Sequence, residues 1–369
     1  MCMAVGRIRH LFPGGNTPQG FFSYYNYVIS SDAARIFIFK GGPGTGKSTF
    51  MRKMGEAFAK LGYDMEFHHC SSDNRSLDGI VIPKLQVAFI DGTAPHIVDP
   101  KNPGCVEEIL HLGEYWNEKG ITSHREQITA CNAEIGKHYQ HAYRFLQAAK
   151  LVYDDTAALN REAVNGKLVN EATENLLAKV FDGMAPTIGC GKVRKLFASA
   201  ITPDGAVHYL DSSVWYMNHC HVISGSPGTG KSTVLQKIID TAVYKGLDIE
   251  VYYCPLAPEK PEHVVIPLLN TAITTSAPLH SYDKTKFPPA SFIDMDERLT
   301  SSIVRKHEEE VVYNQQLFKT LWDKTIRCIQ NSKRLHDQLE TYYIPYMNFQ
   351  GVQRLWEKTY SRVLSYQEN

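Results

Sequence analysis

The chain has 369 residues, of which 43% are apolar and 21% charged, a composition typical of globular proteins and a length sufficient for two hydrophobic cores. Lysine and arginine together number 39, as do aspartate and glutamate, so no overall field attracts nucleic acid or an anionic membrane. No run of about 18 uncharged apolar residues occurs, and residues 1–7 lack the regions of a signal peptide, so we expect a cytoplasmic protein without a membrane span. The eight cysteines are scattered without a Cys-x-x-Cys pair, which favours reduced thiols.

The first elements along the chain are two short β-structures. The sequences Thr17-Pro18-Gln19-Gly20 and Thr202-Pro203-Asp204-Gly205 have proline and glycine where a tight turn favours them, so we predict a β-hairpin near the start of each half. Residues 35–40 are an apolar run rich in β-forming side chains, which predicts a buried strand.

A glycine-rich loop follows this strand and fits the phosphate-binding pattern known as Walker A. Its glycines allow successive backbone N–H groups to point at a phosphate, Lys47 adds a positive charge, and Ser48 offers a hydroxyl to Mg²⁺. A helix is predicted from Lys47 to a stop at Gly62, and its N-terminus also favours an anion. The predicted nucleotide-binding residues are Gly41, Gly42, Pro43, Gly44, Thr45, Gly46, Lys47, Ser48 and Thr49.

Two further strands are predicted at residues 65–70 and 87–91. The second has four apolar residues followed by Asp91, which is the Walker B pattern of a carboxylate that helps to hold Mg²⁺ beside a phosphate loop. Asp91 and Lys47 are therefore the predicted catalytic residues. An aspartate before Gly92 is also ordinary turn chemistry, which is the alternative interpretation.

Polar side chains gather around the ends of these two strands. A transition-metal site is the less favoured interpretation, because no pair has a recognised ligand spacing and Tyr252 and Tyr253 replace two of the histidines in the second half. A substrate-facing role for residues 70–79 is a second hypothesis. An arginine that stabilises phosphate charge is not identified by the sequence, since Arg52, Arg75, Arg125 and the arginines of the other half all qualify. The candidate cluster contains His68, His69, Cys70, Asp73, His96 and Asp99.

Long helices are predicted towards the end of each half. Apolar residues step by three and four from Ile128 to Val152, and a second helix is predicted over residues 168–181. In the second half, the corresponding helices cover residues 304–329 and 352–364. We expect a helical hairpin in each half that packs on its own sheet, because apolar stripes usually face an intramolecular core. A protruding arm that binds a protein partner or a second copy is the alternative.

The chain is predicted to be a duplication, because Lys47 and Lys231 lie in matching motifs 184 residues apart. We predict an α/β fold of two tandem P-loop NTPase domains with mostly parallel sheets, divided near residue 187. The domains are residues 1–186, with a helical segment at about 122–182, and residues 187–369, with a helical segment at about 301–365. The same offset relates Gly62 to Gly246, Cys70 to Cys254, and Val81-Ile82-Pro83 to Val265-Ile266-Pro267.

The second phosphate loop follows a predicted strand at residues 219–224 and opens a helix that ends at Gly246. Thr275 stands where the first half has Asp91, so this site keeps its phosphate cradle and lacks the Walker B carboxylate. Asp294 or Asp296 is the candidate substitute. Ser232 is the predicted hydroxyl ligand of Mg²⁺. The predicted nucleotide-binding residues are Gly225, Ser226, Pro227, Gly228, Thr229, Gly230, Lys231, Ser232 and Thr233.

Several of these segments resemble those of a family of bacterial proteins with tandem P-loop domains, whose members are labelled ATPases or nucleotide kinases. The resemblance covers essentially the whole chain, and its specific motifs lie mostly in the first half. It implies ATP and Mg²⁺ binding in a P-loop NTPase fold and does not imply a substrate. The segments that carry it are residues 9–18, the first loop, residues 70–73 and residues 91–100.

Three functions are consistent with the sequence. The favoured hypothesis is an ATPase that hydrolyses ATP at the first site and binds nucleotide at a degenerate second site, with the helical segments or a partner as the moving part. The first alternative is a nucleotide or small-molecule kinase. The second alternative is a nucleotide-sensing scaffold with little turnover.

Overall fold

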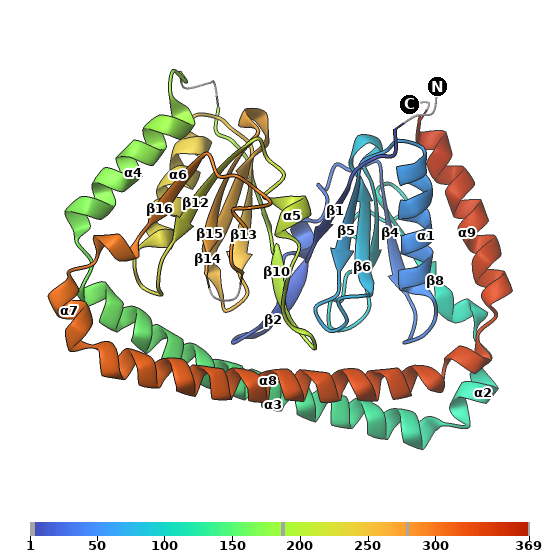
Figure 1. Cartoon of the computed structure of the whole chain (residues 1–369). Helices are drawn as coiled ribbons and strands as arrows, with labels where there is room; N and C mark the ends of the chain where they lie inside the picture. Colours follow the sequence, from blue (N-terminus) through green and yellow to red (C-terminus); the bar gives the residue numbers. More distant parts are fainter. Residues whose placement is uncertain (1–3, 186–188, 278–279, 368–369) are drawn as a thin grey trace.

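The structure, a computed structural model, describes residues 4–185, 189–277 and 280–367 (Figure 1). It has two six-stranded sheets with helices around them, so the predicted α/β class and the two-half layout are confirmed. The predicted division near residue 187 lies outside the described residues. No helix in the described part of the chain is both long enough and apolar enough to cross a membrane.

The two sheets have the same strand order. In the first, the order is β1 (Ile8–Leu11), β5 (Met65–His69), β6 (Leu77–Ile82), β7 (Val87–Asp91), β4 (Arg35–Lys40) and β8 (Glu107–His111). In the second, it is β9 (Val193–Leu196), β13 (Ile249–Cys254), β14 (Ala257–Ile266), β15 (Thr271–Ser276), β12 (His219–Ser224) and β16 (Ser291–Asp294). The sheets are mixed, because β6 and β14 run antiparallel to both of their neighbours while the other pairings are parallel.

Each half also has the predicted β-hairpin. These hairpins pair β2 (Gly14–Thr17) with β3 (Gly20–Ser23) and β10 (Ser199–Thr202) with β11 (Gly205–His208). Backbone hydrogen bonds join Phe12 and Phe197 reciprocally, at 3.0 and 3.1 Å between nitrogen and oxygen. The two halves therefore meet beside equivalent hairpins.

Short 3₁₀ turns occupy Tyr25–Tyr27, Pro83–Leu85, Leu112–Tyr115, Pro267–Leu269, Asp296–Arg298, Ile344–Tyr346 and Ser365–Gln367.

The helix after each glycine-rich loop packs on one face of its own sheet. Helix α1 (Lys47–Lys60) buries Met51, Met54 and Phe58 against that face, and α6 (Lys231–Tyr244) does the same in the second half. These side chains recur every three or four residues, so they form one apolar stripe along the helix. The remaining short helices are α2 (Glu118–Thr122), α5 (Leu210–Ser213) and α7 (Ser301–Lys306).

The predicted helical hairpins are wrong, because each half gives its last helix to the other half (Figure 1). Helix α4 (Gly166–Phe181) belongs to the first half and buries Leu176 and Phe181 in the core of the second sheet. Helix α9 (Phe349–Leu364) belongs to the second half and buries Val352 and Val363 in the core of the first sheet. An apolar stripe predicts that a helix is buried, but it does not specify which of two similar sheets covers it.

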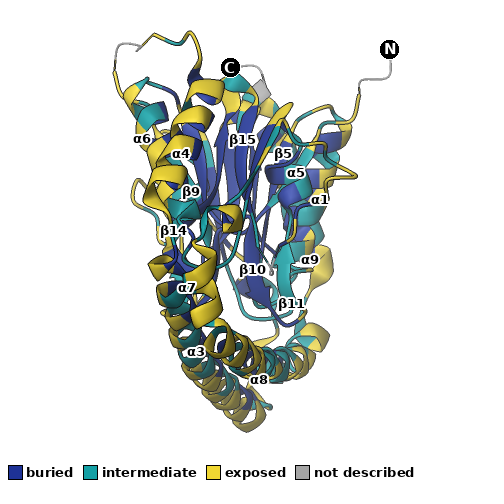
Figure 2. Cartoon of the chain, turned by 60° about the vertical axis from the view of Figure 1, so that its left-hand side comes forward, coloured by how far each residue is buried: buried dark blue, intermediate teal, exposed yellow. Residues whose placement is uncertain are grey.

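Two long helices make this exchange by crossing beneath both sheets. They are α3 (Arg125–Glu162) and α8 (Glu308–Thr341), which lie side by side and antiparallel (Figure 1). Asn314 donates to Asp155 at 2.7 Å and Ser332 donates to the carbonyl of Ile135 at 3.4 Å, which fixes their register. Figure 2 shows that much of the outer surface of this pair is exposed, whereas the strands are buried.

A four-charge cluster joins the two sheets, and we call it the central charge cluster. It contains Arg9 and Glu66 from the first half and their repeat partners Arg194 and Glu250 from the second. Arg194 contacts Glu66 at 2.6 Å and Glu250 at 3.1 Å, and Arg9 contacts both carboxylates as well. Burial alone would raise the pKa of Glu66, but the guanidinium of Arg194 and the other partners hold it well below its usual value.

Candidate functional sites at two glycine-rich loops

The first loop has the backbone that its glycines predict. Gly44 and Gly46 have φ angles of +66° and +92°, in the left-handed region that glycine adopts without strain. Gly46 is the N-cap residue and α1 begins at Lys47. Among the described residues, no acceptor takes the amide hydrogens of Gly44, Thr45 or Gly46. The loop therefore presents free N–H groups beside the positive end of a helix, which is the arrangement that binds phosphate.

Lys47 and Asp91 lie together, as the sequence predicts for a Walker pair. The Lys47 ammonium donates to the carbonyl oxygens of Gly41 and Gly42, both at 2.9 Å, and its Nζ is 3.7 Å from Oδ2 of Asp91. The other oxygen of Asp91 accepts hydrogen bonds from the amide and hydroxyl of Thr93 at 2.9 and 2.6 Å. The carboxylate is thus fixed by its own turn and directed at the lysine.

Ser48 is the first-loop hydroxyl that was predicted to reach Mg²⁺. It lies in the first turn of α1, and its Oγ accepts a hydrogen bond from the amide of Leu77 at 3.0 Å. Because a hydroxyl also has a hydrogen to donate and a second lone pair, this bond leaves capacity for a further partner.

The second loop repeats this geometry with different carboxylates. Gly228 and Gly230 have φ angles of +84° and +99°, and Lys231 opens α6 and donates to the carbonyls of Gly225 and Ser226 at 2.5 and 2.7 Å. Burial lowers the pKa of Lys231, with Asp296 and Glu262 opposing this shift.

Neither carboxylate that was predicted to replace Asp91 stands in its position. Asp296 accepts hydrogen bonds from the amide and hydroxyl of Ser226 at 2.9 and 3.1 Å, so it is bound to the loop itself. Asp294 accepts from the amide of Asp296 at 3.0 Å. Thr275 occupies the position on β15 that is equivalent to Asp91. The carboxylate that lines the site is Glu262, which sequence reasoning missed because it lies on the antiparallel strand β14.

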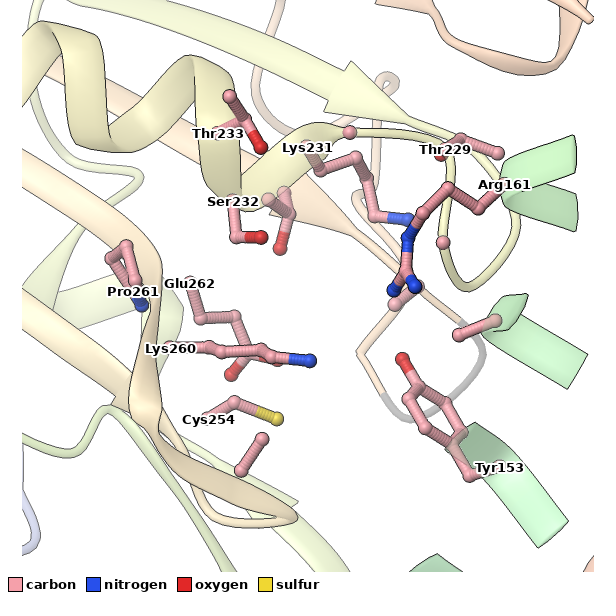
Figure 3. A pocket seen from close by; sticks show the side chains of 16 residues that line it. Tyr153, Arg161, Thr229, Lys231, Ser232, Thr233, Cys254, Lys260, Pro261 and Glu262 are labelled. Carbon is pink, nitrogen blue, oxygen red and sulfur yellow. The ribbon is translucent and has the colours of Figure 1, made fainter. Parts of the chain in front are cut away.

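A cavity of about 150 Å³ opens at the second loop (Figure 3). Its walls come from both halves of the chain, and α3 of the first half contributes Tyr153, Ala157 and Arg161. Lys260 and Glu262 extend into it from β14 (Figure 3). The cavity therefore combines positive charge with backbone amides. The loop residues that line it are Gly228, Thr229, Gly230, Lys231, Ser232 and Thr233.

Helix α3 contacts the second loop, and the turn after α8 contacts the first. A Cβ added to Gly228 would meet the carbonyl oxygen of Ala157 at 2.0 Å, and Asn160 donates to the carbonyl of Pro227 at 2.9 Å. At the first loop, a Cβ on Gly44 would meet Ile344, which follows α8, at 2.8 Å. Each loop is therefore in contact with an element from the opposite half of the sequence.

The polar cluster predicted around the strand ends is only partly assembled. Four of its six members have other partners: His68 contacts Glu66, His69 contacts His10, Asp73 contacts Lys333, and Asp99 contacts Lys40. Cys70 and His96 do come together, and Asp78 joins them although the sequence did not predict it.

Buried charge is disfavoured in this smaller group. Burial raises the pKa of the Cys70 thiol, and burial also raises the pKa of Asp78, with Asp91 adding to that shift and His96 opposing it.

Among the arginines considered from sequence, Arg52 donates to the carbonyl of Arg75 at 2.6 Å. The predicted reduced thiols are consistent with the seven described cysteines, all of which are free.

Comparison with known proteins yields no family model, no curated protein and no solved structure that matches this chain.

Proposed function

We propose that the chain is a Mg²⁺-dependent P-loop NTPase that binds ATP at both loops and hydrolyses it at the first. The observation that carries the proposal is the position of Lys47, whose ammonium lies against the loop carbonyls and 3.7 Å from Asp91. A loop lysine, loop amides without an acceptor and a strand-end carboxylate are the groups that phosphoryl transfer requires.

The donor set also suits a magnesium ion. The hydroxyl of Ser48 and the carboxylate of Asp91 are hard oxygen ligands, which Mg²⁺ prefers, and Ser232 supplies the equivalent hydroxyl at the second loop. When bound, the ion would neutralise phosphate charge. The residues of the chain bind and orient the phosphates: loop amides hold their oxygens, and Lys47 exchanges its bonds to Gly41 and Gly42 for bonds to phosphate.

The contacts of the two loops with α3 and with the turn after α8 support a mechanical consequence of nucleotide binding. Because the carbonyl of Ala157 lies directly over Gly228, a phosphate that widens the second loop must displace the end of α3. Helix α3 is packed along α8. The C-terminal end of α8 leads to Ile344, which lies against Gly44 of the first loop. The long helices thus connect the two sites physically.

Phosphate release by the purified chain tests this function. Wild type should release phosphate from ATP with Mg²⁺ and without an added acceptor, and Lys47→Ala should remove that activity, while Lys231→Ala should retain a substantial part of it. Release that needs a phosphate acceptor would instead support the kinase alternative. Tight ATP binding without release or transfer would support the scaffold alternative, and equal loss in the two lysine variants would contradict unequal sites.

Arg161 gives a separate prediction at the second loop. Its guanidinium lines the cavity from the opposite half, so it is placed to contact phosphate oxygens there. Arg161→Ala should weaken ATP binding at the second loop by about 10- to 100-fold, since a hydrogen bond to a charged group contributes about 1.5–3 kcal/mol. Titration of a fluorescent ATP analogue into Lys47→Ala, with and without the Arg161 change, measures this. Arg144→Ala on the same helix is the matched control, and equal affinities would exclude the contact.

A further inference from the structure

Each half of the chain contains a largely buried group of cysteine, carboxylate and histidine side chains beside its glycine-rich loop. In the first half, ligand atoms of Cys70, Asp78 and His96 all lie within 4.8 Å of one another. We call these residues the first triad. Asp78 and His96 are more than nine-tenths buried, and Nε2 of His96 is 3.5 Å from Oδ2 of Asp78.

The same residue types recur at the repeat offset of 184 residues. Cys254, Glu262 and His280 occupy the positions of Cys70, Asp78 and His96. Ligand atoms of Glu262, His263 and His280 lie within 4.8 Å of one another, and the thiol of Cys254 lies beside Glu262. We call these four residues the second group. Nearby equivalent positions carry unrelated residues in the two halves, as with Asp73 and Ala257. The three positions of the first triad, in contrast, carry side chains that can ligate metals in both halves.

A β-bulge aims the carboxylate in both halves. His68 pairs with Gly79 and His69 pairs with Leu77, so Asp78 is an extra residue without a partner on β5. In the second half, Tyr252 pairs with His263 and Tyr253 pairs with Pro261, which leaves Glu262 extra in the same way. Bulges redirect a side chain at the cost of local ladder hydrogen bonds, and they are common beside functional sites.

Both groups also contain buried nitrogen atoms without partners. Nδ1 of His96 and Nε2 of His263 have no hydrogen-bond partner among the described residues. The ring of His96 is held in place by stacking on Tyr25, with centroids 5.0 Å apart and planes 13° apart. A buried polar atom without a partner is costly, so a bound ligand that engages these nitrogens would be favourable.

We propose that the first triad and the second group are two transition-metal sites, each taking one divalent ion of the zinc class. Thiolate, imidazole and carboxylate together are typical zinc ligands, whereas Mg²⁺ selects oxygen ligands. In the first triad, three protein ligands leave the fourth tetrahedral position open, as in sites where zinc binds a water or a substrate. The sites are distinct from the Mg²⁺ ligands Ser48 and Asp91.

Zinc binding to the full chain, without nucleotide, tests this proposal. Protein stripped with a chelator and equilibrated with zinc should retain two ions per chain, measured by elemental analysis, in the presence of excess Mg²⁺. His96→Gln and His280→Gln should each lower the count to one, and the double variant should retain none. Loss of one ligand should raise the dissociation constant for zinc by about 100-fold. Loss of an outer-shell partner alone raises it by roughly 10- to 100-fold, and a direct ligand should lie at the upper end of that range.

A partly exposed cluster elsewhere supplies the matched control. His336, Asp337 and Glu340 also bring ligand atoms within 4.8 Å of one another, on the surface of α8. His336→Gln should leave the count at two. Cobalt in place of zinc should give a thiolate-to-metal absorption band that Cys70→Ser weakens, and Cys105→Ser, an exposed cysteine, should leave the band unchanged.

Several outcomes would overturn the proposal. These are fewer than one tightly held zinc ion per chain, an unchanged count in His96→Gln, or a loss in His336→Gln alone. If His96→Gln does not fold by circular dichroism, Asp78→Asn and Cys70→Ser carry the same expectation with smaller changes in volume. Since nucleotide is absent, failure here leaves the proposed NTPase function intact.

Discussion

Asp91→Asn is expected to lower the rate of ATP hydrolysis by about 10²–10³-fold, the range found when one preorganised charge-stabilising group is removed. The carboxylate of Asp91 is directed at Lys47 by two hydrogen bonds from Thr93, so it is already in position for the proposed reaction. Asparagine keeps the shape and the oxygen that accepts from Thr93 but removes the charge. Steady-state phosphate release with saturating ATP measures the effect.

Asp32→Asn is the matched control for this change, because Asp32 is an exposed aspartate in the same half. It should retain wild-type turnover. Full turnover by Asp91→Asn, together with an inactive Lys47→Ala, would show that a different carboxylate acts at the first loop. Asp78, which lies one strand away on β6, would then be the residue to replace.

Glu66→Gln is expected to lower the free energy of unfolding by about 3–5 kcal/mol, the cost of removing one partner from a buried ion pair. The variant leaves the guanidinium groups of Arg9 and Arg194 with only the Glu250 carboxylate between them. The free-energy cost of removing water from these two guanidinium groups is then no longer offset by two carboxylates. Urea unfolding of the two proteins, followed by circular dichroism, measures the difference.

The central charge cluster also predicts how stability depends on pH. The pKa of Glu66 is lowered in the folded chain, and so is that of Glu250, which burial alone would raise but the guanidiniums of Arg9 and Arg194 lower. Their stabilisation is therefore fully present above the unfolded value of about 4.3 and is lost as pH falls through the folded values. Glu66→Gln should lose less stability on acidification than wild type. Glu56→Gln, at an exposed position on α1, should match wild type at all pH values, and an equal effect from both changes would argue against the cluster.

Local patterns in the sequence were sufficient to predict the loops and the elements beside them. The glycine spacing specifies the two left-handed turns, and the apolar runs before them specify β4 and β12. The end of β7 at Asp91 followed from four apolar residues and an aspartate. These features depend on residues close together in the chain, where spacing and backbone preference decide the conformation.

The features that depend on long-range choices were not predictable. The stripe on α4 fits either sheet, and only the length of α3, roughly 57 Å for 38 residues, carries it to the second one. The direction of β6 is also not encoded in its own six residues. Asp78 was missed because a bulge, and not the strand alternation, sets where its side chain points.

The number of ATP molecules held by one chain tests the central claim most directly. Equilibrium dialysis with a non-hydrolysable ATP analogue and Mg²⁺ should give two bound molecules for wild type, one for Lys47→Ala, one for Lys231→Ala, and none for the double variant. Binding that is absent in wild type, or that persists unchanged in the double variant, would contradict the account that both glycine-rich loops hold a nucleotide triphosphate.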